Sequence, residues 1–109
     1  MMPYEVRYLR EALNELKALP AYVRSPTRRM IGALRSNPYP PKAKELDLVP
    51  SLVEGMEVKN VYRIWIAGKW RLAYHIDDEE RAVTILAVAP KTPGFYDTVE
   101  TRAPQSQDK

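Results

Sequence analysis

The chain has 109 residues, 45% of them apolar, and a formal net charge of +3, so it is large enough for one hydrophobic core and a single domain is expected. It contains no cysteine and one histidine, which excludes a disulfide framework, a thiolate metal site and a histidine-rich metal cluster; we expect no metal and no cofactor. No run approaches the roughly 18 apolar residues of a membrane span, and the start lacks the pattern of a signal peptide, so we expect a cytoplasmic protein without membrane contact.

The first predicted elements are a strand and a helix. Apolar and charged side chains alternate over residues 4–9, which is the pattern of a strand with one buried face. From Arg10 the apolar spacing becomes helical, and the first helix is expected to run to about Leu19. Its apolar stripe consists of Leu9, Ala12, Leu13, Leu16 and Leu19.

A second helix is predicted to end near Ser36. Ser25 followed by Pro26 has the pattern of an N-cap and a first helical residue, although residues 21–24 could already be helical. Its apolar residues are expected to face the core that the first helix also covers.

Basic residues are concentrated in the first part of the chain. Residues 1–44 hold nine lysines or arginines against three glutamates, whereas residues 45–60 hold four acids against one lysine. Arg28, Arg29 and Arg35 lie on the polar side of the second predicted helix. This bias is compatible with a polyanion or an acidic protein partner, but a solvated helix face is the simpler explanation.

A long connector and three strands follow. Residues 37–41, NPYPP, cannot continue a helix, and from there to residue 60 we expect irregular packing over the core with at most one short turn of helix. Strands are predicted at about 58–66, 70–76 and 82–89. The last is apolar throughout, which indicates a central strand covered on both faces.

The resulting order is β-α-α-β-β-β. It predicts an α+β fold of two layers, in which two N-terminal helices pack on a four-stranded, mainly antiparallel sheet. After residue 98 the chain is polar and non-periodic, so we expect one domain over residues 1–97 and a flexible C-terminal tail over residues 98–109.

Residues 62–76, YRIWIAGKWRLAYHI, predict a hairpin whose register follows from its loop length. A three-residue loop at 67–69 places like residues opposite one another and gives Gly68 the left-handed backbone that such loops need. The expected cross-strand pairs are Ile66 with Trp70, Ile64 with Leu72 and Tyr62 with Tyr74. The apolar face that the helices can cover then consists of Ile64, Ile66, Trp70, Leu72, Tyr74 and Ile76.

The opposite face carries Arg63, Trp65, Arg71 and His75, which form a basic, aromatic and concave surface with Trp65 directly across from Arg71. It suits a phosphate backbone with a stacked base, because guanidinium groups match phosphate oxygens and aromatic faces accept bases. An arginine opposite a tryptophan is also an ordinary cation–π pair, and a lone histidine is more often structural than catalytic. The four acids at residues 77–80 are interpreted as a solvated loop, so no metal is assigned.

The layout and the stretch YRIWIAGKWRLAYHIDDEERAVTILAVAPKTPGFYD together resemble the RelE/ParE superfamily of bacterial toxins from type II toxin-antitoxin modules, over roughly Pro3 to Asp97. The resemblance rests on the YRI strand, a glycine turn, an aromatic-Arg-Leu-x-Tyr strand, an acidic turn, a β-branched strand and a basic residue shortly before a tyrosine. RelE-like members cut messenger RNA on the ribosome without a metal, with the RNA 2′-hydroxyl as nucleophile. ParE-like members poison DNA gyrase instead.

The resemblance implies a role for each matching position. Arg63 matches a phosphate-binding basic residue, and Arg71 matches the arginine that stabilises the scissile phosphate. Lys91 matches a basic position after the last strand where the family often has arginine, and Tyr96 matches the tyrosine that stacks with or orients the substrate base. These four positions are the expected catalytic set. The expected substrate-binding residues around them are Trp65, His75 and Lys44, the last resembling the basic residue before the family's connector.

One position departs from the family pattern. Trp65 stands where RelE carries a second lysine that aids proton removal, and a missing general base costs about 10² to 10⁴ in rate, unless His75 or Lys44 substitutes. The resemblance implies a ribosome-dependent mRNA endoribonuclease that inhibits translation, with the ribosome, mRNA and a cognate antitoxin as partners. The alternatives are a ParE-like toxin of DNA gyrase, which Trp65 favours, and an inactive relative that only binds its antitoxin.

Overall fold

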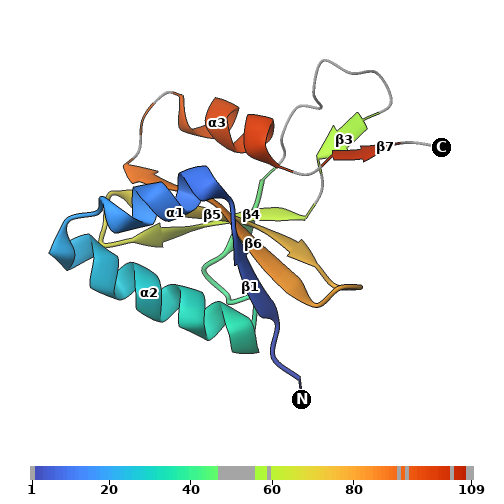
Figure 1. Ribbon diagram of the computed structural model, residues 1–109, viewed down its shortest axis with the longest axis horizontal. Helices are drawn as coiled ribbons and strands as arrows, with labels where there is room; N and C mark the ends of the chain where they lie inside the picture. Colours follow the sequence, from blue (N-terminus) through green and yellow to red (C-terminus); the bar gives the residue numbers. More distant parts are fainter. Residues whose placement is uncertain are drawn as a thin grey trace.

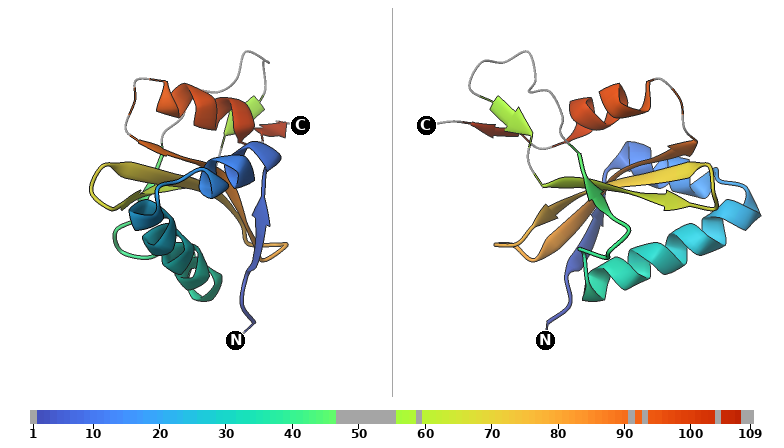
Figure 2. Two further views of the ribbon diagram at one scale, coloured as in Figure 1. Left: turned by 60° about the vertical axis from the view of Figure 1, so that its left-hand side comes forward. Right: turned by 180° about the vertical axis from the view of Figure 1, so that it is seen from behind.

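The computed structural model describes residues 2–46, 56–58, 60–90, 92, 94–103 and 105–107. In this part of the chain, a five-stranded sheet has helices on both faces (Figures 1 and 2). The helices are α1 (Arg10–Lys17), α2 (Ala21–Ser36) and α3 (Phe95–Arg102). The strands of the sheet, in spatial order, are β1 (Glu5–Tyr8), β6 (Ala82–Pro90), β5 (Trp70–Asp77), β4 (Val61–Ile66) and β2 (Lys44–Glu45).

The sheet is mainly antiparallel, as predicted. Strand β1 is parallel to β6, while β5 runs antiparallel to both β6 and β4, and β2 is antiparallel to β4. The predicted α+β class and the β-α-α-β-β-β order are confirmed, with β2, β3 (Met56–Val58), α3 and β7 (Gln105–Gln107) as additional elements. The sheet has five strands instead of the predicted four because β2 adds to its edge, and α3 forms a further layer on the face that the prediction left uncovered. Strand β1 pairs only with residues 82–85 of β6, so beyond residue 85 the edge of β6 that does not pair with β5 has no described strand beside it, and α1 packs against β6.

Two hydrophobic clusters lie on the two faces of the sheet. Helices α1 and α2 cover the first cluster, and the predicted apolar face of the hairpin contributes to it. Its buried residues are Tyr4, Ala12, Leu16, Leu19, Val23, Ile31, Leu34, Ile64, Ile66, Leu72, Tyr74, Ile76, Val83, Ile85 and Val88. Helix α3 covers the second cluster, which consists of Val61, Ala73, Leu86, Ala87, Phe95, Val99 and Ala103.

Helix α2 begins earlier than the Ser25-Pro26 pattern indicates. Its first residue is Ala21, and the carbonyl of Pro20 accepts hydrogen bonds from the amides of Val23 and Arg24, both at 2.9 Å. Val23 is fully buried, so packing of this first turn against the core favours the longer helix. Pro26 lies inside the helix, where it lacks the amide that would bond to the preceding turn.

The connector contains two short strands and no described helical turn. Strand β2 joins the main sheet, and β3 (Met56–Val58) pairs with β7 (Gln105–Gln107) in a separate two-stranded sheet. The strand predicted at 58–66 is divided, because Asn60 adopts a left-handed backbone with φ of 60° and β4 starts after it.

The C-terminal segment corrects the prediction of a frayed tail beginning at residue 98. Helix α3 continues to Arg102, so the expected boundary at residue 97 falls inside it. Phe95, Val99 and Ala103 recur every four residues and are all buried, which gives this polar sequence one apolar side. None of the described helices is long and apolar enough to span a membrane.

Candidate functional site

The hairpin of β4 and β5 has the register that its loop length predicts. Ile66 pairs with Trp70, and Trp65 lies directly across from Arg71. Gly68 adopts a left-handed backbone with φ of 84° at the turn. The three-residue loop therefore determines which side chains of the two strands share a face of the sheet, as predicted from its length.

Both hairpin arginines converge on one indole. The guanidinium carbon of Arg71 lies 4.5 Å from the ring centroid of Trp65, and that of Arg63 lies 5.4 Å from the same centroid. Trp65 is 40% exposed, so one side of this arrangement faces solvent. We call Arg63, Trp65, Arg71 and Tyr96 the candidate site.

Helix α3, which was not predicted from the sequence, covers the sheet face that carries the candidate site. Phe95 and Tyr96 at its start lie with their ring centroids 5.8 Å and 4.9 Å from the Arg71 guanidinium. Arg71 is only 6% exposed as a result, and it is held among three aromatic rings. The structure thus brings Arg63, Arg71 and Tyr96 together, as the family resemblance implies.

Among the residues that the structure describes, the two arginines have no negative partner. Neither the Arg63 nor the Arg71 side chain makes a hydrogen bond or an ion pair there, and the Nε atom of each is buried without an acceptor. A buried cation without an anion is costly, and the aromatic rings offset only part of that cost. The site is therefore electrostatically suited to an anion such as a phosphate.

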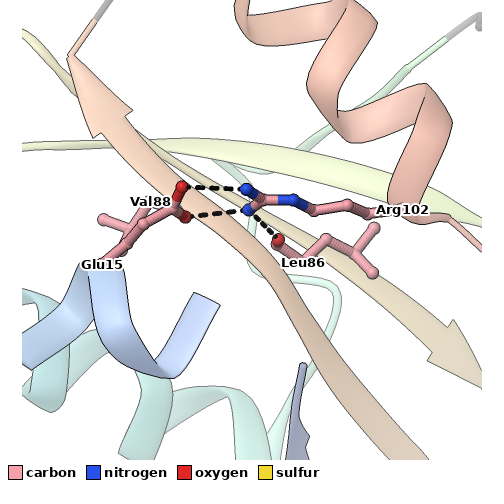
Figure 3. Close-up of polar contacts among 4 residues, drawn as sticks. All are labelled: Glu15, Leu86, Val88 and Arg102. Carbon is pink, nitrogen blue, oxygen red and sulfur yellow. Dashed lines mark hydrogen bonds and ion pairs between the residues drawn. The ribbon is translucent and has the colours of Figure 1, made fainter. Parts of the chain in front are cut away.

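Helix α3 is fastened to α1 and β6 by an ion pair that sequence reasoning missed (Figure 3). The guanidinium of Arg102 donates to both carboxylate oxygens of Glu15, at 3.0 and 3.1 Å, and to the carbonyl of Leu86 at 2.9 Å. The same carboxylate accepts the amide of Val88 at 3.2 Å. The side chains of Glu15 and Arg102 thus form hydrogen bonds with the backbone amide of Val88 and the backbone carbonyl of Leu86, which lie beyond the part of β6 that pairs with β1.

The other expected residues lie at the margin of the site or outside the described part. Lys44 is exposed and pairs in register with Arg63 from the neighbouring strand β2. His75 is half-buried in β5, where burial lowers its pKa against the opposing effect of the Asp77 carboxylate. Lys91 falls outside the described residues.

The described residues contain no group of three or more histidine, aspartate or glutamate side chains that could hold a metal ion. The sequence signal that could have located Phe95 in the site is the four-residue spacing of Phe95, Val99 and Ala103. No comparable signal links Glu15 to Arg102, which are far apart in the chain.

Comparison with known proteins identifies the family. Residues 6–92 match the family described as the ParE toxin of the type II toxin-antitoxin system, parDE. A search of curated proteins gave no match. Among solved structures, the chain is similar to the toxin-antitoxin complex RelBE2 of Mycobacterium tuberculosis, with 29% identity, a TM-score of 0.60 and coverage of 84% of this chain and 94% of that chain.

Two further solved structures share the fold at lower identity. The RelE-RelB complex from Pyrococcus horikoshii has 19% identity and a TM-score of 0.63, covering 84% of this chain and 99% of that chain. A mutant of the E. coli toxin RelE in the free state has 21% identity and a TM-score of 0.66, covering 94% of this chain and 95% of that chain. The family match over most of the chain, together with this shared fold, shows that the chain belongs to the RelE/ParE superfamily of toxins from type II toxin-antitoxin systems.

Proposed function

We propose that this toxin is a RelE-like, ribosome-dependent mRNA endoribonuclease that inhibits translation. The observation that supports it best is the pair of arginines on one indole, neither of which has an anionic partner in the described part of the chain. Guanidinium groups bind phosphate oxygens through paired N–H donors, and aromatic rings stack on bases. Trp65 and Tyr96 supply such rings, with centroids 4.5 and 4.9 Å from the Arg71 guanidinium.

The chemistry follows from these groups. The RNA 2′-hydroxyl attacks the adjacent phosphorus, the bond to the 5′-oxygen breaks, and a 2′,3′-cyclic phosphate remains. Arg71 and Arg63 stabilise the added negative charge of the pentavalent transition state, and Tyr96 holds a base in line for attack. Because the lowered pKa of His75 keeps its ring neutral near pH 7, His75 is a candidate to accept the 2′-hydroxyl proton, with Lys44 as the other candidate. Lys91 contributes a further positive charge.

The burial of Arg71 sets a condition on this chemistry. A phosphate cannot reach a guanidinium that is 6% exposed unless Tyr96 or the start of α3 moves. We therefore expect substrate binding to shift α3, with Tyr96 exchanging the arginine for a base as its stacking partner.

Mapping mRNA 5′ ends in cells after induction of the chain tests the proposal. New ends within translated regions are expected, and Arg71→Ala should abolish them. Arg7→Ala is the matched control, because Arg7 is an exposed arginine that already pairs with Glu5 at 3.2 Å. Cleavage retained in Arg71→Ala would refute the assignment of the site.

A second candidate function is poisoning of DNA gyrase. The family match to ParE and the presence of Trp65 in place of a second lysine favour it. Relaxed or broken DNA after induction, with no new mRNA ends, would support this function and contradict the nuclease. Absence of both effects would indicate an inactive relative that only binds an antitoxin.

We also propose a cognate antitoxin as the partner of this chain. The solved RelBE2 structure of M. tuberculosis and the P. horikoshii structure are complexes of a toxin with its antitoxin. An antitoxin segment could inhibit this chain by covering Arg63 and Trp65 or by displacing the C-terminal segment that carries Tyr96. Copurification with the product of the neighbouring reading frame checks this directly.

A further inference from the structure

The exposed side of α2 is uniformly cationic. The helix, AYVRSPTRRMIGALRS, contains four arginines and no acid. Val23, Thr27, Ile31 and Leu34 point into the core, which leaves the arginines on or beside the solvent side. We call Arg24, Arg28, Arg29 and Arg35 the arginine face. It lies across the sheet from α3, and so from the candidate site (Figure 2).

Within the described ranges, the exposed guanidinium groups of this face are not neutralised. The side chains of Arg28, Arg29 and Arg35 make no hydrogen bond or ion pair to any residue there. By contrast, Arg7 and Arg102 each have a carboxylate partner. Arg24 donates to the carbonyl of Leu19 at 2.8 Å, which fixes its position at the start of the row. A solvated face in a protein of mixed charge would ordinarily carry acids among its bases.

The surface between the arginines is recessed. A hollow of about 350 Å³ is lined by Ala21, Arg24, Ser25, Arg28 and Arg29. A second hollow, of about 580 Å³, lies between α2, α1 and the edge strand β1, and its lining includes Arg28, Gly32 and Arg35 together with the acidic side chain of Glu5. Arg28 borders both. The small residues Ala21, Ser25 and Gly32 line these hollows together with the arginines. A ligand in the hollows can therefore approach the backbone of α2 while it contacts guanidinium groups.

The spacing of the arginines fits a row of phosphates. At 100° and about 1.5 Å per residue, Arg28 and Arg35 lie within about 20° of each other and about 10 Å apart along the axis, with Arg24 about 6 Å before Arg28. Tyr22 is 69% exposed and lies two turns from Arg29, on a side of the helix about 120° around the axis from Arg28 and Arg35. The surface therefore offers a row of phosphate contacts on one side and an arginine with an aromatic ring on the other.

We propose that the arginine face binds an RNA backbone and forms a second RNA contact, separate from the candidate site. The proposal rests on the proposed function, since a nuclease that works within the ribosome is surrounded by RNA on more than one side. RNA is favoured over an acidic protein because protein interfaces depend on buried apolar anchors, and Tyr22 is the one large aromatic side chain that this side of α2 exposes.

The test compares the natural chain with Arg28→Gln/Arg29→Gln/Arg35→Gln. The control Arg7→Gln/Lys42→Gln/Lys69→Gln loses the same charge from exposed positions outside α2. Affinity for a double-stranded RNA oligonucleotide is measured over a range of salt concentrations, with a poly-glutamate peptide as the second ligand. Circular dichroism confirms that both variants fold.

We expect the α2 variant to lose roughly 100-fold in RNA affinity at 0.1 M salt and the slope of log K against log salt to fall by about 2, whereas the control changes little. No RNA binding by the natural chain, an unchanged α2 variant, or equal losses in both variants would overturn the proposal. Loss of poly-glutamate binding alone would overturn it in favour of an acidic protein partner.

The same assay separates this inference from the proposed function. Arg71→Ala should lose less affinity for the RNA duplex than the α2 variant does, because Arg71 is 6% exposed and lies against α3, on the other face of the sheet from α2. If Arg71→Ala still cuts mRNA while the α2 variant loses duplex binding, the assignment of the candidate site fails and the arginine face stands.

Discussion

The pair of Glu15 and Arg102 should hold α3 over the candidate site, and a double-mutant cycle can measure how strongly. Arg102→Met removes the guanidinium but keeps an unbranched side chain, and Glu15→Gln removes the charge but keeps the shape. The single Arg102→Met change also removes the side-chain donor to the Leu86 carbonyl and leaves the Glu15 carboxylate with the Val88 amide as its remaining donor in the described residues.

The expected magnitude follows from the geometry and exposure of this pair. Two parallel N–H donors at 3.0 and 3.1 Å form the bidentate arrangement, which is the stronger kind of ion pair. The side chains of Arg102 and Glu15 are 17% and 31% exposed, between the surface pairs worth about 0.2–1 kcal/mol and buried pairs whose disruption costs about 3–5 kcal/mol. We therefore expect a coupling of about 1–2 kcal/mol.

Urea unfolding of the natural chain, the two single variants and the double variant gives the coupling free energy between Glu15 and Arg102. Hydrogen exchange of the α3 amides measures how often this helix opens locally. Arg102→Met should raise exchange of Thr98 and Ala103, whose amides bond within the helix, by about tenfold. The exposed pair of Arg7 and Glu5, with side chains 44% and 65% exposed, is the control and should couple by less than about 0.5 kcal/mol. A coupling between Glu15 and Arg102 as small as the control, with unchanged α3 exchange, would refute the reasoning.

Three further predictions address packing, pH and catalysis. Val99→Ala should lower the free energy of unfolding by about 2 kcal/mol, because Val99 is fully buried on the side of α3 that packs against the sheet; a change under about 0.5 kcal/mol in urea unfolding would show that α3 packs loosely. The hydroxyls of Tyr39 and Tyr4 each donate to Asp78 at 2.7 Å and lower its pKa, so its stabilising effect is present above the unfolded pKa of about 3.9 and is lost as pH falls through the lower folded value. Asp78→Asn should therefore make Tm fall less steeply between about pH 5 and 2, and an equally steep fall would count against this role. Trp65→Lys should increase cut mRNA ends by at least about tenfold if a missing general base limits the rate, and Trp65→Phe, which supplies no base, should not.

The hairpin could be predicted from the sequence because its information is local. The odd loop at 67–69 and the alternation around it determine which residues face the helices, and Trp65 and Arg71 pair as expected. Helix α3 was not predicted, for the opposite reason. Its residues are mostly polar, and its few apolar residues are buried only because the helix packs against the second face of the sheet, which is a long-range contact. The partner of Glu15 is likewise set by tertiary structure, since nothing near it in the sequence points to Arg102.

The earlier start of α2 shows the same limit at a smaller scale. Ser25 and Pro26 form a good local start signal, yet the burial of Val23 outweighs it and the helix tolerates an internal proline. A local pattern therefore predicts an element here only where long-range packing does not oppose it.

Helix α3 links the stability of this fold to the chemistry of its candidate site. One end of the helix places Phe95 and Tyr96 against Arg71, and the other end is fastened to α1 and β6 through Arg102. A ligand that moves the first end of α3 must work against the ion pair at the second end, so under the proposed function a weaker ion pair should let a phosphate reach Arg71 more readily. A partner that releases Arg102 would instead free α3 as a unit and remove Tyr96 from the site. A small movement of α3 would expose Arg71 to a ligand, whereas a larger movement would remove Tyr96 from the candidate site.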